Sequence, residues 1–206
     1  MKNVPDVHYD RELLAAIPYI PSSYLSYFYL RDQQIKHCVE AEKTRGEVCE
    51  ELEASLLKQY GDPNLKEKPK ELSQRGGSLY STAAVSVVDA IENDKNEYHV
   101  VNVKNNGALP FLEDSDVVEV KCNVNRKGAF PAAVKKPDSP YVIGLMQAVK
   151  AYEKLTVRAV INGSRADALA ALMIHPLIGD YQKAKGVIDE MFEVNAAYVP
   201  AQLLKK

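Results

Sequence analysis

The sequence has 206 residues, of which 46% are hydrophobic and 26% charged, with a formal net charge of −2. This length allows one large domain or two small ones, and we expect a single domain over residues 1–206. The nearly neutral charge excludes an electrostatic case for a nucleic acid or an anionic membrane as partner. No apolar run reaches the roughly 20 residues that span a bilayer, and residues 1–10 lack the apolar core of a signal peptide. We therefore expect a cytoplasmic protein.

The N-terminal third predicts helices. A short helix is expected from Asp10 to Ile17, because Pro18 and Pro21 end it. Strong helix formers then run from Tyr24 to about Tyr60, and Ser22 before them offers an N-cap. We expect one long helix there. A charged loop with two prolines follows it.

The middle of the chain changes its period. Residues 81–93 are alanine and valine nearly all round, which predicts a buried helix. The segments "YHVVNVKNNGALP" and "DVVEVKCNVNRKG" then alternate apolar and polar residues, and each ends in a turn signal. A third strand is expected in "AFPAAV". These segments predict a small antiparallel sheet.

The C-terminal third is helical again. A long helix is expected from Tyr141 to Asn162, with Gly163 as its C-cap. Two further helices are expected at 167–173 and 181–197. Because helices precede and follow a small sheet, the fold class is α+β.

The three cysteines form no CxxC pair and are odd in number, so they are expected to be free thiols that serve as small packing residues: Cys38, Cys49 and Cys122. No two histidines have metal-ligand spacing. We therefore predict no metal ligands in this chain. No glycine-rich fingerprint of a nucleotide-binding strand and helix is present either.

Tyrosines concentrate in "IPYIPSSYLSYFYL", residues 17–30, in a chain that has only 12 tyrosines in all. One interpretation is packing, in which the rings cover the core and the hydroxyls reach water. The other is chemistry, in which a phenol at the start of a helix acts as a base. A phenol has a pKa of about 10, so it needs a helix dipole or a nearby metal to stabilise its phenolate.

Two other motifs have polar candidates. In "RGGSLY", Arg75 could bind a phosphate in bidentate fashion, and Gly76 and Gly77 would let the backbone N–H groups approach it closely. The alternative is an ordinary loop with a surface arginine. In "VNVKNNGALPFL", Asn106 with the next glycine predicts a tight turn, whereas Asn102 on the preceding strand is better placed for sugar hydroxyls.

Four blocks in register give the chain a family resemblance. They are "YDRELLAAIPYIPSSYLSYFYL", "QRGGSLYSTAAVSVVDAIENDK", "VNVKNNGALPFLEDSDVVEVKC" and "ALAALMIHPLIGD". Together they resemble the C-terminal half of the NAD- and manganese-dependent 6-phospho-β-glucosidases of glycoside hydrolase family 4. The resemblance implies a domain of the lactate/malate dehydrogenase C-terminal type without its Rossmann half.

The resemblance also implies a mechanism by redox and elimination. NAD⁺ takes hydride from C3 of the sugar, a base removes the C2 proton, the aglycone leaves, and water and hydride then add. Mn²⁺ polarises the oxygens at C2 and C3. The block "PSSYLSY" implies that Tyr24 is the base, with Tyr27 as the reserve. Arg75 with its two glycines then contacts the 6-phosphate, and Asn102 and Asn105 line the pocket.

The chain departs from the family in length, since family members are about twice as long. The cofactor half and the manganese ligands lie upstream of the first block, so no tight binding of NAD or Mn²⁺ is expected here. The expected partners are a 6-phosphorylated disaccharide or aryl glucoside, an N-terminal Rossmann domain and further copies in a homo-oligomer. We expect little or no hydrolysis by this chain alone. The alternative is a stand-alone phosphosugar-binding or assembly domain without catalysis.

Overall fold

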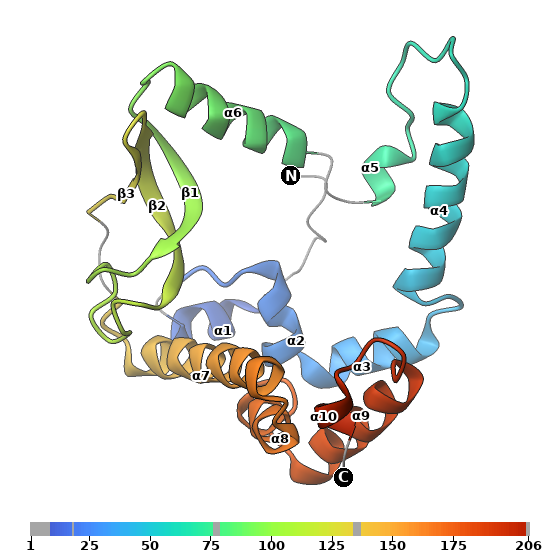
Figure 1. Cartoon of the computed structure of the whole chain (residues 1–206), viewed down its shortest axis with the longest axis vertical. Coiled ribbons are helices and arrows are strands. Elements are labelled where there is room, and N and C mark those ends of the chain that lie inside the picture. Colours follow the sequence, from blue (N-terminus) through green and yellow to red (C-terminus); the bar gives the residue numbers. More distant parts are fainter. Residues whose placement is uncertain (1–8, 18, 76–78, 134–136, 205–206) are drawn as a thin grey trace. The chain divides into compact units, whose positions relative to one another are not determined.

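The computed structural model describes residues 9–17, 19–75, 79–133 and 137–204 (Figure 1). Its contacts divide the chain into two compact units, one of Met1–Lys104 with Val117–Val134 and one of Asn105–Asp116 with Lys135–Lys206. The polypeptide thus leaves the first unit at the end of one strand and returns at the start of the next. Helices precede and follow a three-stranded sheet, so the α+β prediction is confirmed.

The first unit begins with short helices. The single long helix predicted from Tyr24 is wrong, because the chain breaks at Leu30, whose φ of −119° and ψ of 39° are not helical. It breaks again before Thr44, which starts a new helix through a capping box with Glu47. The helices are α1 (Arg11–Ala16), the 3₁₀ turn η1 (Ser23–Leu25), α2 (Ser26–Tyr29), α3 (Arg31–Glu40) and α4 (Arg45–Tyr60).

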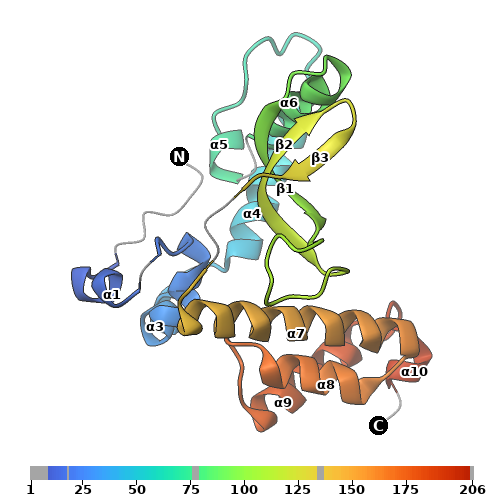
Figure 2. The same cartoon turned by 90° about the vertical axis from the view of Figure 1, so that its left-hand side faces the viewer.

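The rest of the first unit contains two helices and the sheet (Figure 2). The strands run in the order β1-β2-β3, and both pairings are antiparallel. The β1–β2 register places Asn102 opposite Glu119. The elements are α5 (Leu72–Arg75), α6 (Tyr80–Glu92), β1 (Glu97–Lys104), β2 (Val117–Asn125) and β3 (Gly128–Pro131).

The core of this unit lies on one face of β2. Alternate residues of the strand are buried, namely Val118, Val120, Cys122 and Val124. Helix α6 packs against β2, and its Ala90 has no exposed surface. The period of two therefore sorts β2 into a covered face and a face open to solvent.

Two expectations about burial are wrong. The helix at 81–93 forms as predicted, but Ala90 is its only residue classed as buried in the described structure. The cysteines also differ from one another, because Cys122 is buried, Cys49 is half-buried and Cys38 is exposed. Although α6 is largely apolar, β2 is the only described element that packs closely against it.

The second unit is a group of helices. Helix α7 ends as predicted at Gly163, which is left-handed with a φ of 63°. Arg165 joins three of the helices, since it pairs with Asp189, donates to the Leu203 carbonyl and lies over the Phe192 ring. The last long helix ends three residues earlier than predicted. The helices are α7 (Pro140–Asn162), α8 (Arg165–Ile174), α9 (Tyr181–Val194) and α10 (Ala201–Leu204).

None of the helices formed by the described residues is both long and apolar enough to cross a membrane.

The C-cap of α7 gives a test of this packing. A Cβ at Gly163 would lie 2.5 Å from the Cβ of Gln202 on α10, whereas a Cβ at Gly179 would have no neighbour within 4 Å. Both glycines are left-handed, so each alanine substitution costs about 1–2 kcal/mol of conformational energy. We expect Gly163→Ala to lower the free energy of unfolding, measured by urea titration, by clearly more than Gly179→Ala does. Equal losses would contradict the close packing of α10 on this turn.

Candidate functional site

The tyrosine block divides into exposed and packed rings. Tyr24 lies in η1 and is 80% exposed, and Tyr27 lies one turn later in α2 and is 45% exposed. Both follow Ser22, the N-cap residue of η1, whose side chain makes no capping hydrogen bond. Exposure at the start of a helical segment is what the chemical interpretation requires of Tyr24.

The other rings hold the block in place. The hydroxyl of Tyr9 donates to the Ser22 carbonyl at 2.8 Å, and the Tyr9 ring meets Tyr29 edge to face at 6.3 Å. Phe28 in turn meets Tyr29 at 5.1 Å. Burial raises the pKa of Tyr9, which favours its neutral, donating form. The packing interpretation therefore applies to Tyr29, and the exposed surface belongs to Tyr24 and Tyr27.

The phosphate candidates lie between α5 and α6. Arg75 is the last residue of α5. Gly76 and Gly77 lie outside the described residues. Helix α6 begins just beyond them without a side-chain cap and without an acidic residue in its first turn. Such a helix start carries a partial positive charge and favours an anion.

Arg45 is a residue that the sequence analysis did not single out. Its guanidinium donates to the carbonyl of Gln74 at 2.8 Å, which ties the start of α4 to the end of α5 beside Arg75. An isolated arginine that binds a backbone carbonyl 29 positions away leaves no pattern in the sequence.

The two asparagine candidates lie in opposite environments. Asn102 is exposed on the open face of β1, opposite Glu119. Asn105 has no exposed surface. Its Nδ2 donates to the carbonyls of Leu109, Leu112 and Glu113, and its Oδ1 accepts from the Leu109 N–H at 2.7 Å. Because these bonds occupy the amide, Asn105 could affect a ligand only through the loop that it shapes.

Residues 105–116, the asparagine loop, are also held by α7. Lys154 Nζ lies 2.8 Å from Asp116 Oδ1 and 2.8 Å from Glu113 Oε2. The other oxygen of Asp116 accepts from the Glu113 N–H, and Gln147 donates to the Phe111 carbonyl. The Lys154 ammonium is the main cause that lowers the pKa of the buried Asp116 carboxyl. The loop is thus fixed by charge and by hydrogen bonds.

The candidates belong to separate packed groups. The closely packed pairs include α2 with α3, α4 with α5, and β1 with β2. The tyrosine block, Arg75 and Asn102 lie in different pairs. The structure therefore places the three groups of candidate residues in separate local settings.

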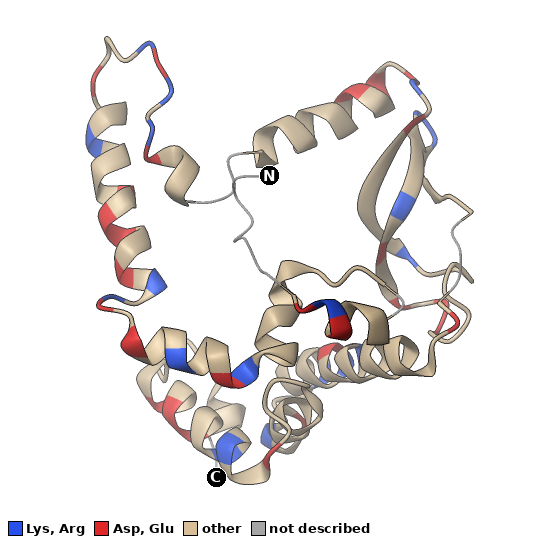
Figure 3. Ribbon diagram, turned by 180° about the vertical axis from the view of Figure 1, so that it is seen from behind, with Lys and Arg blue, Asp and Glu red and all other residues tan. Residues whose placement is uncertain are grey.

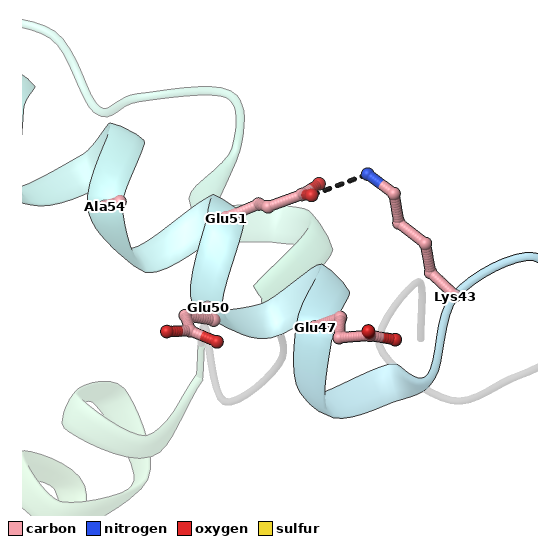
Figure 4. Close-up of a pocket in the computed structure, with 5 residues that line it drawn as sticks. All are labelled: Lys43, Glu47, Glu50, Glu51 and Ala54. Atoms are coloured by element: carbon pink, nitrogen blue, oxygen red, sulfur yellow. Dashed lines mark hydrogen bonds and ion pairs between the residues drawn. The ribbon is translucent and has the colours of Figure 1, made fainter.

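Cavities elsewhere do not add to these candidates. One of about 350 Å³ lies along the start of α4, where Lys43 pairs with Glu51 at 2.5 Å (Figure 4). Its other lining residues are Glu47, Glu50 and Ala54. The Thr44 backbone N–H that donates to Glu47 is the largest cause that lowers the pKa of that carboxyl, so Glu47 is occupied by the cap.

His175 lies at the end of a helix. It is the C-cap residue of α8, and its Nδ1 accepts from the Leu177 N–H at 3.2 Å. Its ring meets Tyr152 edge to face at 4.5 Å. Burial lowers the pKa of this imidazole, which favours the neutral acceptor.

The described residues do not fit a resident metal ion. No group of three His, Cys, Asp or Glu side chains within the described ranges could hold one. The printed sequence also has no glycine-rich nucleotide fingerprint. Steps that need a metal or a nucleotide cannot be assigned to side chains of this chain.

The sequence and the fold match a known family. Residues 1–178 match the model of the family 4 glycosyl hydrolase C-terminal domain. The chain belongs to this family, which confirms the resemblance read from the four blocks.

Individual relatives agree. A probable 6-phospho-β-glucosidase of Bacillus subtilis is 38% identical over 97% of this chain. The 6-phospho-β-glucosidase of Thermotoga maritima, solved with NAD and glucose-6-phosphate, matches 95% of the chain at 33% identity with a TM-score of 0.86. A 6-phospho-α-glucosidase from gut microorganisms, solved with NAD and Mn²⁺, matches 92% of the chain at 27% identity with a TM-score of 0.76.

Length separates this chain from those relatives. It covers 46% of the Bacillus protein, 46% of the Thermotoga chain and 42% of the gut chain. The chain therefore spans less than half the length of each.

Asn105 provides a test of the loop. We expect Asn105→Ala to lower the free energy of unfolding by about 3 kcal/mol, because it leaves a buried N–H and buried carbonyls without partners. Asn102→Ala, at an exposed position on the same strand and loop segment, should change it by less than about 0.5 kcal/mol. Urea unfolding of both variants measures the difference. Similar values for the two would contradict the role of Asn105.

The ion pair at Asp116 predicts a pH dependence. The pKa of Asp116 is lowered in the folded state, so its stabilisation is complete above the unfolded value of about 3.9 and is lost as pH falls through the folded value. We expect Asp116→Asn to lose less stability than wild type between pH 6 and pH 2, followed by urea unfolding at each pH. Parallel losses would show that the pair does not contribute.

Proposed function

We propose that this chain is the C-terminal domain of a 6-phospho-β-glucosidase. The observation that carries the proposal is Tyr24, exposed at the start of η1 in a chain that belongs to the family 4 C-terminal domain. The full protein is proposed to hydrolyse 6-phosphorylated β-linked disaccharides or aryl glucosides with NAD and Mn²⁺. The β-linkage is supported by identity, which is 32–38% to the three β-specific relatives and 25–29% to the α-specific or maltose-specific ones.

Within that reaction, Tyr24 accepts the proton from C2 of the sugar, and Tyr27 lines the same side of the site. A base must lie within hydrogen-bond reach of the proton it removes. The contact between Tyr9 and the Ser22 carbonyl fixes the backbone from which Tyr24 projects. Tyr29 packs edge to face against both Tyr9 and Phe28, and these contacts hold the rest of the block.

The 6-phosphate is proposed to bind between α5 and α6. Arg75 supplies the guanidinium, Gly76 and Gly77 supply backbone N–H groups, and the uncapped start of α6 supplies its dipole. Arg45 holds the end of α5 in position through Gln74. Asn102 is proposed to contact a sugar hydroxyl from the open face of β1.

The remaining parts of the site lie outside this chain. The metal ligands and the nucleotide site are assigned to an N-terminal Rossmann domain, since the described residues offer neither. Little or no hydrolysis is expected without that domain. A charged phosphosugar does not cross a bilayer unaided, which supports action in the cytoplasm.

Contacts between copies are also proposed. In the second unit, α7 exposes Val157, Val160 and Ile161, which recur at helical spacing on one face. Exposed apolar clusters of this kind mark surfaces where proteins associate. We therefore propose a homo-oligomer in which this end of α7 takes part.

Replacement of Tyr24 tests the proposed base. The assay uses this chain joined behind the N-terminal portion of the Thermotoga relative, with NAD⁺ and Mn²⁺ added and a 6-phosphorylated aryl β-glucoside as substrate. We expect Tyr24→Phe to lower kcat by at least ~100-fold and to abolish exchange of the C2 proton with deuterated solvent. Tyr27→Phe should lower kcat by less than ~10-fold.

Two results would count against this function. Full turnover and full C2 exchange in Tyr24→Phe would remove the base from the proposal. Micromolar binding of cellobiose 6-phosphate by the chain alone, without hydrolysis in the joined protein, would favour the stand-alone binding domain.

A further inference from the structure

Helix α6 has a side that no other described element covers. At 100° per residue, Ser81, Ala84, Val85 and Val88 fall within about one quadrant of the helix. All four are exposed, Val85 by 66% and Val88 by 57%. This set of four residues is the outer face of α6.

The opposite side of the helix already has its partner. Ala90 lies opposite the outer face and has no exposed surface, and Val87 beside it is half-buried. Helix α6 packs against β2. The outer face therefore cannot be the side that the sheet covers. It is a second apolar side of the same helix, in addition to the side that packs on the sheet.

The outer face carries no charge over the first turns of α6, and its first charged residue is Glu92, at the end of the helix. Figure 3 shows α6 without charged residues over its first turns, with acidic residues only toward the end that adjoins the sheet. In the sequence the first of these is Asp89, which binds Lys95 at the far end of the helix. A surface helix normally carries charged residues opposite its core side. Their absence from the first turns, where Ser81, Ala84, Val85 and Val88 lie, indicates a surface that another protein segment covers.

The length of the relatives indicates what that segment is. The chain spans less than half of each solved or curated relative, so most of those proteins precedes the matched C-terminal domain. The solved Thermotoga relative contains NAD, for which this chain has no fingerprint. An NAD-binding portion is thus a partner of known chemistry, and ligand sites form preferentially between domains.

We propose that the outer face of α6 is the surface on which the NAD-binding portion of the protein packs. This rests on the proposed function, because it assumes that such a portion acts together with this chain. Position also favours it. The same helix starts at the proposed phosphate site, so a domain seated on Ser81, Ala84, Val85 and Val88 brings its nucleotide toward the bound sugar.

Cysteine labelling tests the proposal. Val85→Cys is compared with Val100→Cys, because both valines are 66% exposed and Val100 lies on the open face of the sheet. Both are made with Cys38→Ser and Cys49→Ser, which removes the accessible native thiols, while Cys122 stays buried. Reaction rates with iodoacetamide are measured on the chain alone and on the chain joined behind the N-terminal portion of the Thermotoga relative, in the fraction retained by immobilised NAD⁺.

We expect equal labelling rates at the two positions in the chain alone. In the joined protein the rate at Val85→Cys should fall at least 10-fold, while that at Val100→Cys stays unchanged. Unchanged labelling of Val85→Cys, equal slowing at both positions, or the absence of any NAD-retained fraction would overturn the proposal.

Protection of Val85→Cys in the chain alone would also overturn it. Protection that grows with protein concentration would identify a second copy as the occupant, and protection at every concentration would identify another part of this chain. Hydrolysis by the joined protein is measured separately. A joined protein with a protected α6 and no hydrolysis would leave this surface in place and refute the proposed function.

Discussion

The pairing of β1 with β2 is the constraint on which the first unit depends. Eight residue pairs in register fix which side chains of each strand face α6 and which face solvent. A slip of one residue would exchange the two faces. It would expose Val118, Val120 and Cys122, and it would turn Asn102 inward. The position of α6, which packs on β2, follows from the same register.

The loop between these strands extends that constraint to the second unit. The Asn105 N–H donates to the Asp116 carbonyl at 2.7 Å, which closes the base of the loop where the strands end. The Asn105 side chain then satisfies the backbone inside the loop, and Lys154 pairs with Glu113 and Asp116 on the segment that returns to β2. A buried amide and a buried carboxylate are both stable there because each has partners.

The tyrosine block contains both packed and exposed rings. Tyr29 packs with Phe28 and Tyr9, and this packing fixes the short helical segments. Tyr24 and Tyr27 remain exposed on those segments. Packing and chemistry were alternatives for the cluster as a whole, but they are compatible once each ring is considered separately. A rigid support of this kind is what a positioned base needs.

The chain holds some of the groups that the proposed function requires and lacks others among its described residues. It has exposed phenols, an arginine beside a helix start and a polar strand face. Within the described ranges it has no metal-ligand cluster. Helix α6, which is open on one side, adjoins the proposed phosphate site. The proposed second domain would supply the missing chemistry and cover this surface.

The sequence by itself determined the element order, the three strands, the glycine that ends α7 and the family. These depend on short-range patterns: a period of two or of 3.6, a positive φ at Gly163, and blocks of residues in register. The breaks at Leu30 and before Thr44 were missed, because helix formers continue on both sides of them.

Only the tertiary structure decided burial. It showed that Asn105 is enclosed while Asn102 is exposed, that Cys38 is exposed while Cys122 is buried, and that α6 is open on one side. Burial depends on which distant segments pack together, and the residues next to a position in the sequence do not indicate this. Local patterns set the backbone, whereas contacts between remote segments set which side chains are left for function.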